Sequence, residues 1–129
     1  MVNNNMMDTT AIKKMLKSYF DAFYNVDTKA LHKIFHEKAH IYGHDEQGNL
    51  EDIDKKTFLK IISSFNSNGE NPKFVRNDEI LAIDFISKDV AVARVKLRFS
   101  NLVCTDILNL ICLDGEWYII SVLDYKESV

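Results

Sequence analysis

An Asp114-Gly115 pair near the end of this 129-residue chain separates two segments in which apolar side chains alternate with polar ones. Asp-Gly in this setting is the strongest short-range signal for a β-hairpin, because a type I′ turn requires a positive φ at both central residues. The turn also sets the register, since side chains alternate between the two faces of a strand. Counting outward from the turn predicts the pairs Leu113 with Glu116, Cys112 with Trp117, Leu110 with Ile119, Leu108 with Ser121 and Asp106 with Leu123.

In this register, Asp106 is the one carboxylate on the apolar inner face of the hairpin, which also carries Trp117. A carboxylate on an apolar face is costly unless it is hydrogen-bonded, and burial would raise its pKa towards the range of a general acid or base. Two interpretations therefore stay open for Asp106. One is a structural hydrogen bond to an amide of a helix or loop, and the other is a role in a pocket at the open end of the hairpin.

The outer face of the same hairpin is also rich in apolar side chains. It is predicted to carry Ile107, Ile111, Leu113, Tyr118, Ile120 and Val122 beside Thr105, Asn109, Glu116 and Asp124. So many apolar groups are unfavourable in contact with solvent, and a twofold dimer through this face would bury them. We therefore expect a homodimer that forms through the outer sheet face.

Helical spacing of apolar residues predicts three helices in the first half of the chain. The first spans 9–25, the second starts at Asp27 and buries Phe35, and the third starts at Asp54 and ends at 66–69. Asp27 and Asp54 are typical helix N-caps, because their side chains can accept hydrogen bonds from the first turn.

Extended segments fill most of the remaining chain, and Pro72 lies in the loop that precedes the last four of them. The predicted strands are 39–43, 50–53, 75–87, 89–100, 103–113 and 116–126. Short links between the last four favour antiparallel neighbours. Three helices followed by a meander indicate an α+β fold with the helices on one face of the sheet. We expect one domain over residues 1–129, frayed over 1–7.

Composition excludes several classes of function. Hydrophobic residues make up 47% of the chain, charged residues 27%, and the net charge is -3. This balance is typical of a globular protein and gives no basic footprint for nucleic acid. No segment approaches the ~20 apolar residues of a membrane span, and the first residues, MVNNNMMDTT, lack the charged region followed by an apolar stretch that is typical of a signal peptide. Cys104 and Cys112 are predicted to be free thiols, and we expect a soluble, cytoplasmic protein.

Three segments carry a resemblance to a known family. They are YFDAFYNVDTKALHKIFHEKAHIYGHDEQGNL, DEILAIDFISKDVAVARVKLRF and CTDILNLICLDGEWYII, which lie between Tyr19 and Lys126. Their core spacing and the pattern T-D-x-L followed by D-G-E-W-x-I resemble the nuclear transport factor 2-like superfamily, and within it the putative lumazine-binding family. The resemblance implies a cystatin-like cone, in which a curved antiparallel sheet wraps around the helices and encloses a pocket, and it often implies dimers through the outer sheet face.

The resemblance also gives meaning to the aromatic residues. A conical pocket would be lined by side chains from elements that converge on the inner sheet face, and a planar heterocycle could stack on them. The candidate ligand-binding residues are Tyr19, Phe23, Tyr42, Phe58, Phe65 and Trp117. Aromatic residues at helical spacing are also typical of a core, so packing remains the alternative for each of them.

Some members of the superfamily, such as ketosteroid isomerases and scytalone dehydratases, are enzymes. In an isomerase-like mechanism a carboxylate moves a proton while a second acidic donor, often a tyrosine, stabilises an enolate. Here Asp106 would be the carboxylate and Tyr19 or Tyr42 the donor. No residue matches the isomerase motif one for one.

The histidines and the basic residues give weaker signals. His32 and His36 are four residues apart, a spacing that can chelate a metal on a helix, but no further ligand completes the site. We therefore expect no metal and no dedicated cofactor. Arg94, Lys96 and Arg98 form a basic stripe on the outer sheet face, and we expect solvated or paired charges there rather than an anion site.

Three functions stay open from the sequence. The first is a small-molecule binding domain whose ligand is aromatic or heterocyclic. The second is an enzyme of isomerase or dehydratase type that uses Asp106 as a proton shuttle. The third is a structural or interaction module whose pocket is filled by its own side chains.

Overall fold

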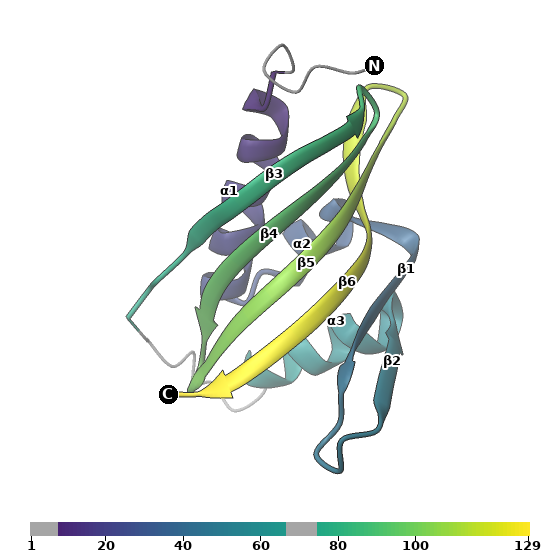
Figure 1. Ribbon diagram of the computed structural model, residues 1–129. Helices are drawn as coiled ribbons and strands as arrows, with labels where there is room; N and C mark the ends of the chain where they lie inside the picture. Colours follow the sequence, from purple (N-terminus) through teal and green to yellow (C-terminus); the bar gives the residue numbers. More distant parts are fainter. Residues whose placement is uncertain (1–7, 67–74) are drawn as a thin grey trace.

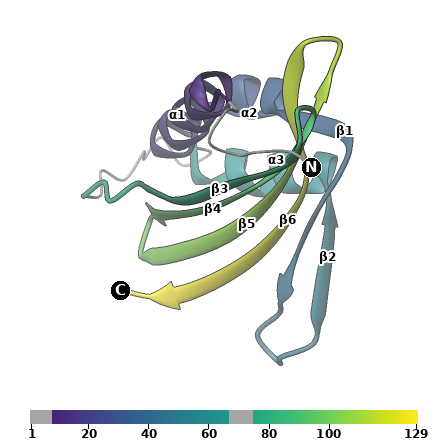
Figure 2. The same cartoon turned by 45° about the horizontal axis from the view of Figure 1, so that its top comes forward.

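The computed structural model describes residues 8–66 and 75–129. Three helices cover one face of a six-stranded sheet that curves around them without closing (Figures 1 and 2). The helices are α1 (Thr10–Asn25), α2 (Thr28–Ile34) and α3 (Lys55–Ser63), followed by the 3-10 helix η2 (Ser64–Asn66). The strands are β1 (Phe35–His44), β2 (Leu50–Asp54), β3 (Glu79–Ser87), β4 (Val90–Phe99), β5 (Leu102–Leu113) and β6 (Glu116–Ser128). The expected α+β architecture with a cystatin-like sheet is confirmed.

The helices α2 and α3 begin directly after the N-cap residues that the sequence predicts. The side chain of Asp27 accepts a hydrogen bond from the amide of Ala30 at 3.1 Å, and that of Asp54 accepts one from Thr57 at 2.8 Å. Each bond satisfies one of the amides that have no partner in the first turn of a helix. The predicted stop of the third helix at 66–69 and the loop with Pro72 fall mostly outside the described residues, as do residues 1–7.

The second helix is shorter than predicted. α2 ends at Ile34, and Phe35 begins β1 with an extended backbone. His36 therefore lies on a strand, so the helical spacing on which its pairing with His32 rested does not exist. Apolar residues at three-residue spacing did not reveal this boundary, because Phe35 is buried in either conformation.

The sheet order is β2-β1-β6-β5-β4-β3, and the two edge pairs and the central meander are antiparallel. β1 and β6, however, pair in parallel, which the expectation of a wholly antiparallel sheet did not include. Short links constrain only strands that follow each other in the chain. β1 and β6 are separated by four other strands, so their direction was open until the tertiary structure set it.

The closing hairpin has the predicted turn and a changed register. Asp114 and Gly115 have φ values of 52° and 82°, as a type I′ turn requires, and Cys112 pairs with Trp117. Farther from the turn, Leu110 pairs with Ile119 and Asn109 pairs with Ser121. Ile120 therefore has no partner and forms a β-bulge.

The bulge moves every later residue of β6 by one position. The predicted pairs of Leu108 with Ser121 and of Asp106 with Leu123 are wrong: Leu108 pairs with Val122, and Asp106 pairs with Asp124. Val122 and Asp124, which were expected on the outer face, now share the inner face with Asp106, since a shift of one residue exchanges the two faces of a strand.

The core lies between the inner sheet face and the helices. Its largest fully buried side chains are Tyr19, Phe35, Ile12, Leu16, Leu31, Leu108, Leu110, Ile119 and Val95. The curvature of the sheet in Figure 2 allows β4, β5 and β6 to wrap around α1 and α3. Within the described segments, no helix is long and apolar enough to cross a membrane.

A buried lysine joins α3 to the end of α2. The ammonium of Lys55 donates hydrogen bonds of 2.8 Å to the carbonyl oxygens of His32 and Phe35. These carbonyls lie at the end of α2, where the helix leaves them without partners and where a positive charge is favourable. Lys55 therefore fixes the corner at which α2 turns into β1.

We predict that Lys55→Met lowers the free energy of unfolding by about 2 kcal/mol, because it removes both hydrogen bonds and leaves two carbonyls unpaired. Lys56→Met is the matched control: Lys56 is exposed and neighbours Lys55 in the same turn of α3, so its change should stay within about 0.5 kcal/mol. Urea unfolding of both variants measures the difference. Equal stabilities would contradict the anchoring role of Lys55.

Candidate functional site

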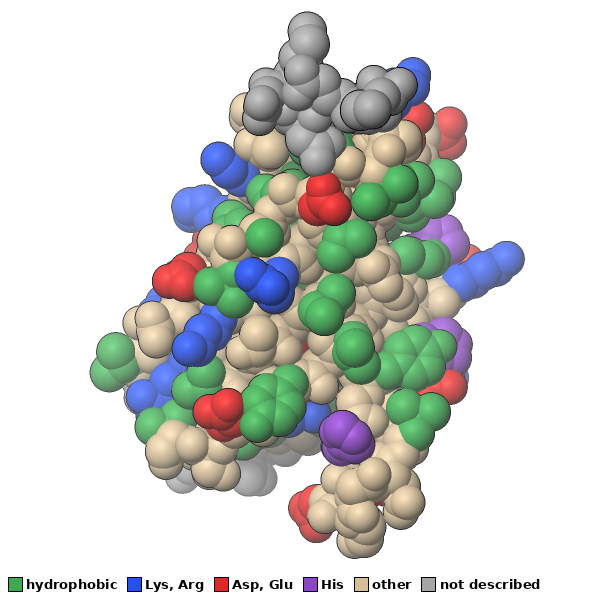
Figure 3. Space-filling model, viewed as in Figure 1, with side chains coloured by type: hydrophobic (Ala, Val, Ile, Leu, Met, Phe, Trp, Pro, Cys, Tyr) green, Lys and Arg blue, Asp and Glu red, His purple; other side chains and the backbone are tan. Residues whose placement is uncertain are grey.

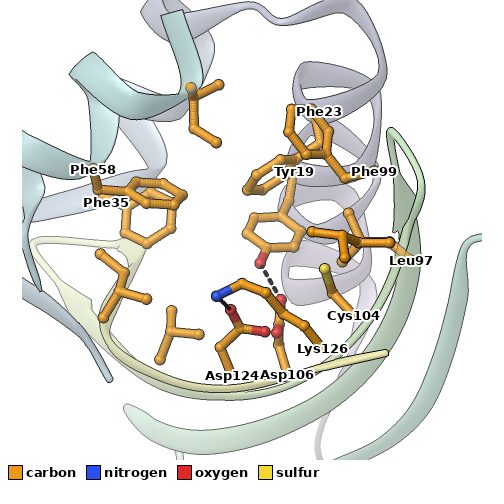
Figure 4. Close-up of a pocket in the computed structure, with 14 residues that line it drawn as sticks. Tyr19, Phe23, Phe35, Phe58, Leu97, Phe99, Cys104, Asp106, Asp124 and Lys126 are labelled. Carbon is orange, nitrogen blue, oxygen red and sulfur yellow. Dashed lines mark hydrogen bonds and ion pairs between the residues drawn. The ribbon is translucent and has the colours of Figure 1, made fainter. Parts of the chain in front are cut away.

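A cavity of about 80 Å³ lies between the inner sheet face and the helices α1 and α3 (Figure 4). It is lined by Tyr19, Phe23, Phe35, Ile41, Phe58, Ile62, Leu97, Phe99, Leu102, Cys104, Asp106, Val122, Asp124 and Lys126. Lys126 is the only one of these side chains that is substantially exposed. The cavity therefore reaches solvent at the Lys126 end.

Most of the wall is aromatic and aliphatic. The rings of Tyr19 and Phe23 from α1 meet edge to face at 4.9 Å between centroids, and Phe23 contacts Phe99 of β4 at 5.6 Å. On the opposite side Phe35 lies 5.3 Å from Phe58 of α3. The two groups also contact each other, since the ring centroids of Phe23 and Phe58 are 6.0 Å apart and those of Tyr19 and Phe35 are 6.2 Å apart. Such walls favour a flat apolar ligand.

The polar groups of the cavity gather at one part of its sheet side, on β5 and β6. The Tyr19 hydroxyl donates a hydrogen bond of 2.9 Å to Oδ2 of Asp106, and the Lys126 ammonium lies 2.9 Å from Oδ2 of Asp124. β5 supplies Asp106, β6 supplies Asp124 and Lys126, and α1 supplies Tyr19. Because Asp106 and Asp124 are directly paired across the two strands, their carboxyl groups lie next to each other at the floor of the cavity (Figure 4).

Burial and the second carboxylate change the ionisation of Asp106. Asp106 is only 5% exposed to solvent. Burial and the neighbouring carboxyl group of Asp124 raise the pKa of Asp106 well above its usual range, while the Tyr19 hydrogen bond and the Lys126 charge oppose the increase. The environment of Asp106 therefore favours its protonated form over the ionised one.

The neighbouring groups respond to the same environment. Burial, with the charge and hydrogen bond of Asp106, raises the pKa of Tyr19, so its hydroxyl keeps its proton. Burial and the two aspartates raise the pKa of Cys104 to about 12. A thiol with this pKa is not a nucleophile at neutral pH, because the thiolate is the reactive form. Burial lowers the pKa of Lys126, but the Asp124 hydrogen bond and nearby negative charges outweigh it and raise the pKa overall.

Four of the seven residues chosen from the sequence meet at this cavity: Tyr19, Phe23, Phe58 and Asp106. The other three do not line it. Trp117 lies near the hairpin turn and packs against Phe85 at 6.0 Å, and Phe65 packs against Phe99 at 4.7 Å. Tyr42 stacks on His40. Of the two tyrosines considered as partners for Asp106, the structure brings only Tyr19 to it.

Asp124 and Lys126 are the polar residues that sequence reasoning missed. An uninterrupted hairpin points both of them to the outer face. One signal of the bulge exists in the sequence: the apolar residues with inner positions change phase from Trp117 and Ile119 to Val122. Since Ile120 and Leu123 are apolar as well, that change is hidden among apolar residues on both faces.

The histidines do not gather at a common point. Among residues 8–66 and 75–129, no three His, Cys, Asp or Glu side chains are placed to hold a metal ion. His40 instead contacts Asp52 at 2.6 Å across the β1–β2 pair, and both side chains are largely exposed.

We predict that Asp106→Asn changes how stability depends on pH. The pKa of Asp106 is raised in the folded state, so its contribution to stability is complete below about pH 4 and decreases as the pH rises towards the folded pKa. Asparagine does not titrate, yet it can accept from Tyr19 and donate to Asp124. The wild type should therefore lose up to about 1.4 kcal/mol per pH unit relative to the variant in this window. Urea unfolding between about pH 4.5 and 7.5 measures both slopes, and parallel slopes would contradict the raised pKa.

Comparison with solved structures confirms the fold. A nuclear transport factor 2-like protein of unknown function from Shewanella baltica OS155 matches with a TM-score of 0.81 and 23% identity, over 93% of this chain and 94% of that one. A ketosteroid isomerase-like protein from Erwinia carotovora atroseptica SCRI1043 matches with a TM-score of 0.71 and 16% identity, over 93% and 96%. A domain of unknown function with a cystatin-like fold from Nostoc punctiforme PCC 73102 gives 0.71 and 15%, over 95% and 78%.

Sequence comparison identifies the family. No functionally curated protein matches the chain. The sequence model of the family described as Putative lumazine-binding matches residues 7–123, which include every element from α1 to most of β6. The chain therefore belongs to the putative lumazine-binding family of nuclear transport factor 2-like proteins.

Proposed function

We propose that this protein binds a small aromatic or heterocyclic molecule in the cavity between the sheet and the helices α1 and α3. One observation carries the proposal: an aromatic-walled cavity ends in a polar group of Tyr19, Asp106, Asp124 and Lys126. A protein core gains nothing from placing two carboxyl groups together, whereas ligand sites combine apolar walls with a few converging polar groups. The family match and the nuclear transport factor 2-like neighbours support the same conclusion.

The size of the cavity limits the ligand. Its volume of about 80 Å³ is smaller than the roughly 300–1,000 Å³ of pockets for drug-sized ligands. A ring system therefore needs room that the wall must supply by moving. Phe58, which is only partly buried, and the exposed Lys126 are the lining side chains best able to turn aside. The proposed ligand is thus small and flat, and its entry route passes Lys126.

A thermal-shift screen of flavins, pterins, lumazines and steroids tests the proposal. A specific ligand should raise the melting temperature with its concentration, since binding to the folded state stabilises it by mass action. Val122→Phe, which fills the cavity, should abolish this shift. Val92→Phe is the matched control, because Val92 lies on the opposite face of β4 and outside the lining. A shift that survives Val122→Phe would place the ligand elsewhere, and no shift with any compound would favour a structural or interaction module.

Catalysis is a second candidate, favoured by the buried carboxyl of Asp106 beside a second carboxylate and a tyrosine hydroxyl. In this function Asp106 would act as the proton shuttle of an isomerase- or dehydratase-like reaction. Any product formed in the same screen should disappear in Asp106→Asn. Unchanged turnover in that variant would exclude the role.

We also propose that the protein is a homodimer through the outer sheet face. Figure 3 views this face, on which several hydrophobic side chains lie at the surface among charged ones. Its exposed apolar residues include Ile107, Leu113, Leu123 and Tyr125. Leu123 and Tyr125 belong to this face because of the bulge, which removes Val122 and Asp124 from it. A twofold contact would bury these residues against their own copies.

We predict a mass in solution of twice 14.9 kDa at micromolar concentration. Ile107→Glu should convert this dimer to a monomer, because it would bury an unpaired charge in the interface. Ile61→Glu is the control: Ile61 is similarly exposed, at 43% against 38% for Ile107, but lies on α3 at the opposite side of the sheet. Light scattering of the wild type, Ile107→Glu and Ile61→Glu measures the mass of each protein in solution. A monomeric wild type, or equal effects of the two changes, would contradict the outer-face dimer.

A cytoplasmic location completes the proposal. Cys104 and Cys112 are both free thiols, which are typical of a reducing compartment.

A further inference from the structure

Two buried oxygen atoms at the floor of the cavity lack partners. Oδ1 of Asp106 and Oδ1 of Asp124 are both inaccessible to solvent, and neither receives a hydrogen bond from any group in the described residues. The remaining oxygen of each carboxyl is bonded, to Tyr19 and to Lys126 respectively. Buried polar atoms are rarely left unpaired, because each one costs free energy. These two atoms therefore require an explanation.

A single proton shared by the carboxyl groups of Asp106 and Asp124 would pair both oxygen atoms. Two ionised carboxyl groups can only accept hydrogen bonds, and adjacent like charges in an apolar site repel each other. If Asp106 carries one proton on Oδ1, it donates to Oδ1 of Asp124, and every oxygen of the pair is then satisfied. Asp106 is the better holder, since it is the more deeply buried and its carboxyl hydrogen-bonds to the neutral Tyr19 hydroxyl, whereas Asp124 contacts the Lys126 ammonium.

We propose, on the basis of the binding function above, that Asp106, Asp124 and Lys126 form one unit with no net charge and that this unit selects an uncharged ligand. The unit contains a neutral carboxylic acid, a carboxylate and an ammonium, and its charges sum to zero. A charged ligand would leave an uncompensated charge inside an aromatic cavity, which is costly. An uncharged ligand brings no such charge.

The groups around the unit do not change this sum. Tyr19 from α1 and Cys104 from β5 face it, and both keep their protons at neutral pH. Glu51 of β2 acts on Lys126 from the side of the mouth. The lining residues from β1, β4 and α3 are all apolar; they are Phe35, Ile41, Leu97, Phe99, Phe58 and Ile62.

The unit also defines the polar edge of the ligand. An ammonium has three donors, and Lys126 uses one of them on Asp124. A carboxylate has about four acceptor positions, so Asp124 can accept a further bond. The complementary ligand has a hydrogen-bond acceptor next to a donor, as in an amide, a lactam or a cyclic ureide. Asp124 and Lys126 would contact this edge, and Asp106 would act as a positioning residue that orients Asp124.

The shared proton can be tested without any ligand. Carbon-13 NMR of the aspartate carboxyl groups should show Asp106 titrating well above the usual aspartate range in the full-length protein. Asp124→Asn should lower this pKa, because it removes the neighbouring charge, and Lys126→Met should raise it. Asp114→Asn, in the turn of the same hairpin, should leave it unchanged. An Asp106 titration in the usual range, or one that ignores Asp124→Asn, would overturn the proposal.

The charge selection is tested with three ring compounds of nearly equal shape: benzamide, benzoate and benzamidine. Their binding is followed by NMR chemical shifts in the wild type and in Phe58→Ala, which enlarges the cavity without altering its polar side. Benzamide should bind at least about tenfold more tightly than either charged compound, as expected when a charge is buried without a partner. In the Phe58→Ala background, Lys126→Met should shift the preference to benzamidine. Asp124→Asn should shift it to benzoate at a pH below the lowered pKa of Asp106, where the Lys126 ammonium has no carboxylate to compensate it.

The outcomes separate this inference from the proposed function. If benzoate or benzamidine binds the wild-type unit as tightly as benzamide, or if the two substitutions leave the order unchanged, the selection rule is wrong while the cavity remains a binding site. If none of the three binds to either protein and the wider screen also finds no ligand, the binding function itself fails, and the selection rule fails with it. The NMR titration decides independently whether the two carboxyl groups share a proton.

Discussion

The pairing of β5 with β6 through the bulge at Ile120 is the constraint on which the rest of the site depends. It puts Asp124 directly opposite Asp106 and turns Val122 into the core. Without the bulge, the inner face would carry one carboxylate and the outer face the other. One unpaired residue in a strand therefore creates both the polar floor of the cavity and the apolar surface opposite it, since it exchanges the faces of all residues that follow.

Each face of the sheet carries groups in an unfavourable environment: buried carboxyl groups on the inner face and exposed apolar side chains on the outer face. On the inner face, aromatic rings from α1, α3, β1 and β4 surround buried polar groups, and a proton on Asp106 resolves the repulsion that two adjacent carboxylates would create. On the outer face, apolar residues such as Ile107 and Leu123 remain partly exposed to solvent within one chain. A ligand site on one side and a subunit contact on the other are consistent solutions, and the same strands β5 and β6 contribute to both.

Burial also keeps two other ionisable groups of the site in their protonated forms. Tyr19 and Cys104 both face the carboxyl groups, yet burial raises the pKa of each, so neither ionises at neutral pH. Among the polar lining residues in the described part of the chain, Lys126 is the one exposed to solvent.

Local signals in the sequence determined the elements: Asp27 and Asp54 as helix caps, the Asp114-Gly115 turn, and the pairing of Cys112 with Trp117. These depend on neighbouring residues, whose geometry the chain itself imposes. The parallel pairing of β1 with β6, the end of α2 before Phe35 and the bulge at Ile120 depend on contacts between distant segments. Tyr19 and Asp106 could be chosen from the sequence because they lie on α1 and β5, and the bulge in β6 changes the direction of neither side chain. Asp124 and Lys126 could not, because only the packed sheet decides on which face a bulged strand continues.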